Sequence, residues 1–327
     1  MLPKSRQPWI DAAKGFGVLL VIIGHLLYSS TLDNLNQAIY SFHTPLFFML
    51  SGYVDHRSTN RKDYYKRKIR RLVIPYVIFV AMSFQLIHRQ YLLGDSIDRI
   101  VKDIFYYDGR IAFNCPLWFI AVLFQVYLVS GLINWEQVNK YGYCFILVAL
   151  CFLNLFIFRA NEAHCGCDFN RFGFNRTTIA LFFFTIGKAI TKYWKAARKI
   201  DILVAGVAFL IWYYSAMIAN RKVSLYSYSF DSMWWFLVSG TLGSLVVILL
   251  FRQIKNCQIL RTIGRHSIIY LGTQYLWIVP FTEYVKENGW DKTNRYVIAM
   301  FLMTLVYVFI VEAGIFVFER VKEKYES

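Results

Sequence analysis

The stretch "WIDAAKGFGVLLVIIGHLLYSS", residues 9–30, has the length and apolarity of a membrane-spanning helix but carries three ionisable side chains. At about 1.5 Å per residue, a helix of this length crosses the roughly 30 Å hydrocarbon layer of a bilayer. Leaving a charged side chain at the centre of such a helix costs on the order of 3 kcal/mol. Asp11, Lys14 and His25 are therefore candidates for a functional site.

Lys14 and His25 share one face of this predicted helix. At about 100° per residue, the step between them is three turns plus about 20°, with a rise of about 16 Å. Asp11 lies on nearly the same stripe and can neutralise Lys14 near the interface. Gly15 lets another helix or a ligand approach the backbone closely. The alternative is structural: Lys14 reaches to the interface, and His25 hydrogen-bonds a neighbouring helix.

The composition indicates a polytopic membrane protein. Of the 327 residues, 57% are hydrophobic and 19% are aromatic, which is far from the composition of a soluble domain. The net charge of +16 would also suit a nucleic-acid-binding protein. However, the basic residues occur in short clusters between apolar runs rather than on a soluble module, so we expect no nucleic-acid partner.

Apolar runs of spanning length predict an all-α polytopic membrane protein with about ten transmembrane helices. Within the segment 38–55, Pro45 and Gly52 favour a short, interrupted helix. We expect a single domain over residues 1–327, with no separate soluble domain and with the first helix retained. The predicted spans are 9–30, 38–55, 71–92, 115–133, 143–159, 177–194, 200–219, 233–251, 267–283 and 296–318.

The distribution of basic residues predicts the orientation in the membrane. If the N-terminus is cytoplasmic, most of the 36 lysines and arginines fall in cytoplasmic segments, including a cluster of eight within residues 57–71. The opposite loops carry many of the acidic residues. We therefore expect a multi-pass protein of the cell membrane, plasma or inner, with both termini in the cytoplasm.

Two helices carry specific motifs. The first has a basic residue, ten intervening residues and a histidine, which are Lys14 and His25. The second contains "IYSFHTPLFFMLSGY", residues 39–53, with a Phe-His-x-Pro-x-Phe-Phe phrase that ends in Ser-Gly. In both motifs the chain resembles the membrane-bound acyltransferase family 3, whose members O-acylate glycans and other acceptors. An Arg-x-x-Arg pair before the third helix is a further family feature, matched by Arg67 with Arg70 or by Lys68 with Arg71.

The resemblance implies an integral-membrane O-acyltransferase that moves acetyl from cytoplasmic acetyl-CoA to a hydroxyl of a cell-surface or lipid-linked polysaccharide. Such a reaction needs a group that removes the hydroxyl proton, and imidazole suits this role. His25 is the candidate, either as general base or as an acylated relay. His43 is expected to complete the acceptor site; alternatively, it hydrogen-bonds an irregular start of its helix.

The donor is expected to bind on the cytoplasmic side. Arginine binds phosphates with two parallel hydrogen bonds, so Arg67, Arg70 and Arg71 are candidates for contacts with CoA, and the resemblance adds Lys14. The alternative for the cluster 57–71 is plain anchoring by the positive-inside rule. The expected partners are acyl-CoA, the glycan acceptor, membrane lipid and polysaccharide-synthesis enzymes.

No metal cofactor is expected. The "HCGCD" stretch, residues 164–168, lacks the paired Cys-x-x-Cys spacing of structural zinc sites. In one respect the chain departs from the resemblance, because it has Gln274 near a position where many relatives carry histidine. The alternative function is a secondary transporter or glycolipid flippase, for which a broken helix and buried ionisable residues are equally natural.

Overall fold

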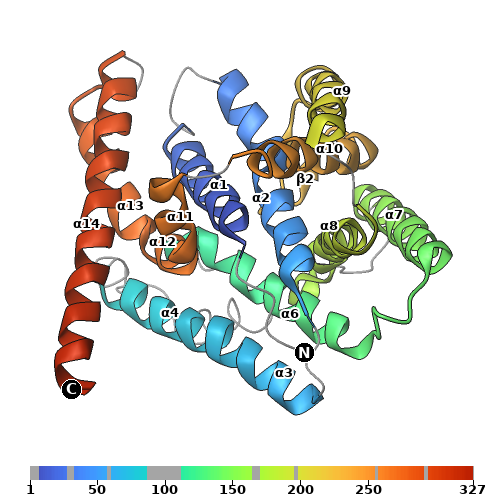
Figure 1. Cartoon of the computed structure of the whole chain (residues 1–327). Coiled ribbons are helices and arrows are strands. Elements are labelled where there is room, and N and C mark those ends of the chain that lie inside the picture. Colours follow the sequence, from blue (N-terminus) through green and yellow to red (C-terminus); the bar gives the residue numbers. More distant parts are fainter. Residues whose placement is uncertain are drawn as a thin grey trace. The chain divides into compact units, whose positions relative to one another are not determined.

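The computed structural model of the chain describes residues 7–27, 33–56, 60–86, 112–163, 170–194, 198–254, 257–290 and 294–326. These residues are almost entirely helical (Figure 1). They form two compact units. The first unit consists of residues 1–36 and 254–327, and the second unit consists of residues 37–253.

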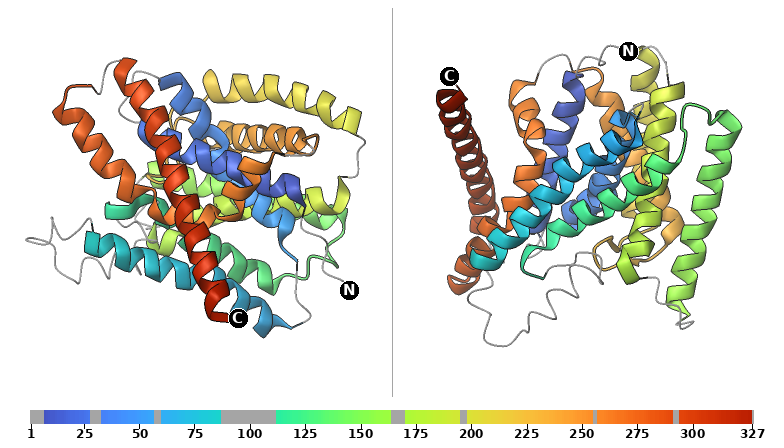
Figure 2. Two further views of the ribbon diagram at one scale, coloured as in Figure 1. Left: turned by 60° about the vertical axis from the view of Figure 1, so that its left-hand side comes forward. Right: turned by 90° about the horizontal axis from the view of Figure 1, so that it is seen from below.

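The second unit is a bundle of helices with one short hairpin. Within it, α9 packs along α10, and α8 packs against both α6 and α7 (Figures 1 and 2). Its elements are α2 (Asp33–Val54) from Gln37 onward, α3 (Arg61–Lys68), the π-helix η1 (Ile69–Val73), α4 (Ile74–Leu86), the 3₁₀-helix η3 (Ala112–Leu117), α6 (Trp118–Leu132), α7 (Lys140–Glu162), the 3₁₀-helix η4 (Arg171–Gly173), α8 (Phe174–Tyr193), α9 (Arg198–Met217), β1 (Val223–Ser224), β2 (Ser229–Phe230) and α10 (Met233–Phe251).

Helices α2 and α8 touch backbone to backbone. A Cβ atom on Gly52 would lie 2.0 Å from the carbonyl oxygen of Phe184, and one on Gly187 would lie 2.0 Å from that of Met49. Only glycine permits this approach. The glycine that ends the second-helix motif is therefore explained by helix packing.

The first unit joins the two ends of the chain. It contains α1 (Pro8–Leu27), α11 (Gln258–Arg265), α12 (Ser267–Thr273), α13 (Tyr275–Glu287) and α14 (Asn294–Glu326). Helices α1 and α11 cross at two glycines. A Cβ on Gly15 would lie 1.9 Å from the carbonyl oxygen of Leu260, and one on Gly264 would lie 1.7 Å from that of Asp11. The prediction that Gly15 admits a close helix neighbour is confirmed.

The helices agree with an all-α membrane protein. Each of the ten predicted spans contains a described helix. Six helices within the described residues are long and apolar enough to cross a membrane: Pro8–Leu27, Asn114–Leu132, Lys140–Glu162, Lys199–Met217, Met233–Gln253 and Arg295–Glu323. The number of crossings and the cytoplasmic position of both termini stay predictions.

The irregularities in the helices lie elsewhere than predicted. Helix α2 is 22 residues long and continues past Pro45 without interruption. The prediction of an interrupted helix in 38–55 is therefore wrong. Proline removes one backbone donor but leaves the other helical bonds intact, and Gly240 of α10 makes room beside the Pro45 ring. In the predicted span 267–283, Gln274 stands between α12 and α13. This is a one-residue irregularity, because Gln274 keeps helical dihedral angles and helical hydrogen bonds to Tyr270 and Ile278. The stretch 164–168 falls within residues 164–169, outside the described part of the chain.

Candidate active site

The imidazole of His25 meets Tyr275 inside the first unit. Nδ1 of His25 lies 3.4 Å from the Tyr275 hydroxyl, and the two rings meet edge to face with centroids 5.2 Å apart. His25 is half-buried in the last turn of α1, and Tyr275 is the first residue of α13. The hydrogen bond at one ring nitrogen decides whether the other carries a proton. The contact with Tyr275 is therefore one that bears on which nitrogen of His25 carries the proton.

The junction between α12 and α13, which precedes Tyr275, is hydrogen-bonded to α14. The hydroxyls of Thr273 and Tyr307 are 2.8 Å apart, and Tyr307 also donates to the carbonyl oxygen of Tyr270 at 3.0 Å. One turn away from Thr273, the Tyr270 hydroxyl donates to Oε1 of Glu312 at 2.9 Å. These three bonds tie the segment that precedes Tyr275 to α14.

At the junction between α12 and α13, Gln274 has one side-chain atom without a hydrogen bond among the described residues. The side chain is buried, and its Nε2 donates to the carbonyl oxygen of Leu271 at 3.3 Å. Its Oε1 is buried without a hydrogen-bond partner among the described residues. An unmade bond of this kind costs about 1–3 kcal/mol. A ligand hydroxyl that reached this oxygen would recover that cost.

Lys14 and Asp11 lie in the first turns of α1. The helix is continuous from Pro8 to Leu27, so the predicted separation of Lys14 and His25, about 16 Å along one face, holds. Lys14 is half-buried. The Asp11 carboxylate is buried and lies 3.9 Å from Nε of Arg265 on α11. Asp11 thus helps to hold α11 against α1.

His43 belongs to the second unit, and both of its ring nitrogens bond within α2. Nδ1 donates to the carbonyl oxygen of Ile39 at 2.8 Å, and Nε2 lies 3.0 Å from the Thr44 hydroxyl. The side chain is buried, with the Tyr40 ring edge-on to it. These contacts match the alternative in which His43 satisfies its own helix. Its role in an acceptor site stays a prediction.

The basic run before the third predicted span forms α3 and η1. Asn60 caps α3 by accepting a hydrogen bond from the backbone N–H of Lys62 at 2.9 Å. Arg67, Arg70 and Arg71 are all exposed. The π-turn that contains Arg70 and Arg71 is a rare irregularity that often marks functional sites. The three predicted donor-binding arginines are thus presented to the surroundings by one short segment.

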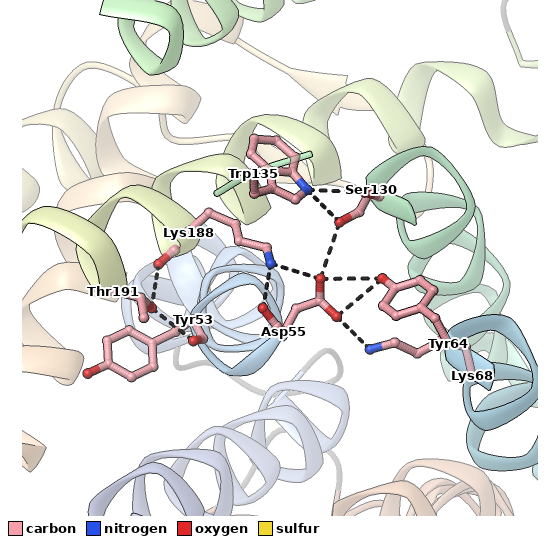
Figure 3. Close-up of polar contacts among 9 residues, drawn as sticks. Tyr53, Asp55, Tyr64, Lys68, Ser130, Trp135, Lys188 and Thr191 are labelled. Atoms are coloured by element: carbon pink, nitrogen blue, oxygen red, sulfur yellow. Dashed lines mark hydrogen bonds and ion pairs between the residues drawn. The ribbon is translucent and has the colours of Figure 1, made fainter. Parts of the chain in front are cut away.

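The buried side of this segment is bonded to a carboxylate, that of Asp55, which directly follows α2 and is itself buried (Figure 3). Lys68 donates to Oδ1 at 2.8 Å, and Lys188 of α8 pairs with Oδ2 at 2.9 Å. The Tyr64 hydroxyl donates at 3.2 Å and the Ser130 hydroxyl of α6 donates at 3.2 Å. Together these five residues, called the Asp55 cluster below, join α2, α3, α6 and α8.

Lys68 sits in an aromatic and largely dry environment. Its Nζ lies 3.3 Å from the centre of the Tyr127 ring, within the range of a cation–π interaction. Burial lowers the pKa of Lys68 to about 8, although the charge of Asp55 raises it, and the charges of Lys188 and Arg71 lower it further. The ion pair with Asp55 is therefore what keeps Lys68 charged near neutral pH.

Several of these residues are not among the predicted site residues. Tyr275, Asp55 and Lys188 contact partners that are distant in sequence, and nothing in the local pattern identifies those partners. Lys188 does leave a signal, because it is a charged residue inside an apolar run. Asp55 leaves a weaker signal, because it is an acidic residue at the end of a predicted span.

Comparisons with known proteins agree with the resemblance. The sequence model of a protein family described as an acyltransferase domain matches residues 7–316. The nodulation protein NolL of Mesorhizobium japonicum is 34% identical over 93 residues, an alignment that covers 25% of this chain and 25% of that protein. No solved structure matches the chain.

Proposed function

Because the chain belongs to the acyltransferase 3 family, we propose that it is an O-acyltransferase of the cell membrane that transfers acetyl from cytoplasmic acetyl-CoA to a polysaccharide hydroxyl. The acceptor would be a cell-surface or lipid-linked polysaccharide. Beyond the family match, one observation supports the proposal. A half-buried histidine of the first membrane helix contacts a tyrosine that can set its protonation.

His25 is the residue that handles the proton. In the general-base route, the unprotonated nitrogen of His25 takes the proton of the acceptor hydroxyl while the oxygen attacks the thioester carbonyl. The C–S bond then breaks, and the imidazolium returns its proton to the departing CoA thiolate. In the relay route, His25 attacks the thioester, releases CoA, and passes the acetyl group from its own nitrogen to the hydroxyl.

The exposed arginines of α3 and η1 are proposed to hold the phosphates of CoA. Guanidinium groups match phosphate oxygens with paired hydrogen bonds. Of the two possible Arg-x-x-Arg pairs, Arg67 with Arg70 is favoured, because Lys68 of the other pair is engaged by Asp55. Lys14, half-buried on the His25 face of α1, is proposed as a further contact for the donor.

The test is acyl transfer by the purified protein in detergent, supplied with acetyl-labelled acetyl-CoA and candidate glycans. Label on the glycan supports the proposal. Label that stays on the protein when no glycan is added supports the relay route, and its absence supports the base route. Counterflow of an intact solute in vesicles, insensitive to acetyl-CoA, would instead support a transporter or flippase.

A further inference from the structure

We propose that Asp55 is a positioning residue for the acyl-CoA donor. Its buried carboxylate holds α3 and η1 at one rotation, so that Arg67, Arg70 and Arg71 face outward together. This inference rests on the proposed function, in which those arginines bind the phosphates of CoA. Asp55 itself would touch neither the donor nor the reacting atoms.

The first step is that one carboxylate anchors two successive turns of α3. Tyr64 and Lys68 are four residues apart and therefore lie on one face of the helix. Both donate to Asp55, Tyr64 at 3.2 Å and Lys68 at 2.8 Å. Leu72, four residues further on, is also buried. Arg67, Arg70 and Arg71 lie on the neighbouring side of the helix, about 100° away on average, and are exposed. Because the Tyr64 and Lys68 face is fixed inward, the rotation of the helix that exposes the arginines is fixed with it.

The second step is that Asp55 is held independently of α3. Lys188 of α8 pairs with its carboxylate at 2.9 Å and also donates to its backbone carbonyl oxygen. Ser130 of α6 donates to the same carboxylate and in turn accepts a bond from Nε1 of Trp135 at 2.9 Å. The anchor is therefore fixed by two other helices (Figure 3). It can impose an orientation on α3 instead of following it.

The third step concerns charge, and it separates positioning from direct binding. Asp55 is one negative charge between the two positive charges of Lys68 and Lys188. If this cluster itself bound a phosphate, removing the carboxylate would leave more positive charge and tighten donor binding. If Asp55 positions the arginines, the same change lets the two lysines repel each other and loosens α3, so donor binding weakens.

The experiment measures acetyl-CoA binding and steady-state kinetics of the purified full chain with Asp55→Asn. The control is Asp201→Asn, because Asp201 is equally buried in the second unit, where it lies 3.4 Å from Arg252 and accepts a bond from Trp194. We expect Asp55→Asn to raise the Kd and the KM for acetyl-CoA about tenfold, with kcat at saturating donor within about twofold of wild type. Asp201→Asn should leave the Kd unchanged.

Milder variants keep the inference testable if Asp55→Asn does not fold. Tyr64→Phe removes one bond to the carboxylate and should raise the Kd about twofold to threefold. Lys68→Met should weaken binding as Asp55→Asn does, whereas Lys68→Arg, which keeps the charge, should restore most of it. A merely structural role would not produce this pattern in KM alone.

The outcomes distinguish this inference from the proposed function. A wild-type protein that binds no acetyl-CoA would overturn both. A wild-type protein that binds acetyl-CoA, with an unchanged or lower Kd in folded Asp55→Asn and Lys68→Met, would overturn the positioning role alone. Equal weakening by Asp201→Asn would also overturn it, because loss of any buried carboxylate would then have the same effect.

Discussion

The hydroxyl of Tyr275 lies 3.4 Å from Nδ1 of His25, at the point where α12 ends and α13 begins. If the tyrosine oxygen accepts the Nδ1 proton, Nε2 keeps its lone pair and can act as a base or nucleophile. If the tyrosine donates instead, Nε2 carries the proton and is inactive. The proposed reaction requires the first arrangement.

Tyr275→Phe is expected to lower kcat for acetyl transfer by about tenfold to a hundredfold, less than the loss of the base itself. The reason is that His25 loses the partner that selects its reactive nitrogen. The KM for acetyl-CoA should stay unchanged, because the contact does not hold the donor. Tyr284→Phe is the matched control, since it removes an exposed hydroxyl from the same helix. Faster transfer by Tyr275→Phe would show that the tyrosine holds the unreactive form.

The double substitution Arg67→Ala with Arg70→Ala should weaken acetyl-CoA binding by at least about tenfold. Each arginine is expected to supply charge-assisted bonds worth roughly 1.5–3 kcal/mol to a phosphate. At saturating donor, kcat should change little. Exposed Arg159 of α7, paired with Glu162, offers a control of the same charge. An unchanged dissociation constant, measured by titration calorimetry, would remove α3 from the donor site.

The lowered pKa of Lys68 predicts that alkaline pH has opposite effects on acetyl-CoA binding and on the stability of the fold. Its pKa in the folded protein is about 8, below the ordinary value of 10.5, because burial disfavours its charge. Above about pH 8 the ion pair with Asp55 is lost and acetyl-CoA affinity should fall. Between about pH 8 and 10.5, Lys68 is protonated in the unfolded chain but not in the folded protein. The free energy of unfolding, relative to that of Lys68→Met, should therefore rise with pH. Parallel pH series for both variants would test this; affinity that declines identically in Lys68→Met would exclude Lys68 as its cause.

Gly15→Val tests the crossing of α1 and α11. The new Cβ would lie 1.9 Å from the carbonyl oxygen of Leu260, a backbone atom that no rotamer change can move away. We expect a loss of at least about 3 kcal/mol in stability, seen as a lower thermal midpoint in detergent. Gly314→Ala in α14, with nothing within 4 Å of its Cβ, should be neutral or stabilising. Equal midpoints for the two variants would contradict the close crossing.

The sequence predicts the elements of this protein better than their contacts. Residues 9–30 were expected to form one helix, and α1 runs from Pro8 to Leu27, because length and apolarity alone specify a spanning helix. The continuous course of α2 past Pro45 was not predicted. Whether a proline breaks a helix depends on the neighbours that receive its ring, here Gly240 of α10.

The contacts of the site depend on residues far apart in the chain. Tyr275 is 250 positions from His25, and Lys188 is 133 positions from Asp55. Hydropathy and spacing do not specify which faces of two distant helices meet. The candidate residues His25, Arg67 and Arg70 can be proposed from sequence, because an ionisable side chain in or beside an apolar run is visible locally and is costly to keep there. Their roles stay predictions.

The most direct test of the central claim is acetyl transfer by purified His25→Ala, followed with labelled acetyl-CoA and a glycan that the wild-type protein acetylates. The account predicts a folded protein that binds acetyl-CoA as wild type does but transfers label at least about 10²-fold more slowly. Transfer by His25→Ala at the wild-type rate would contradict it.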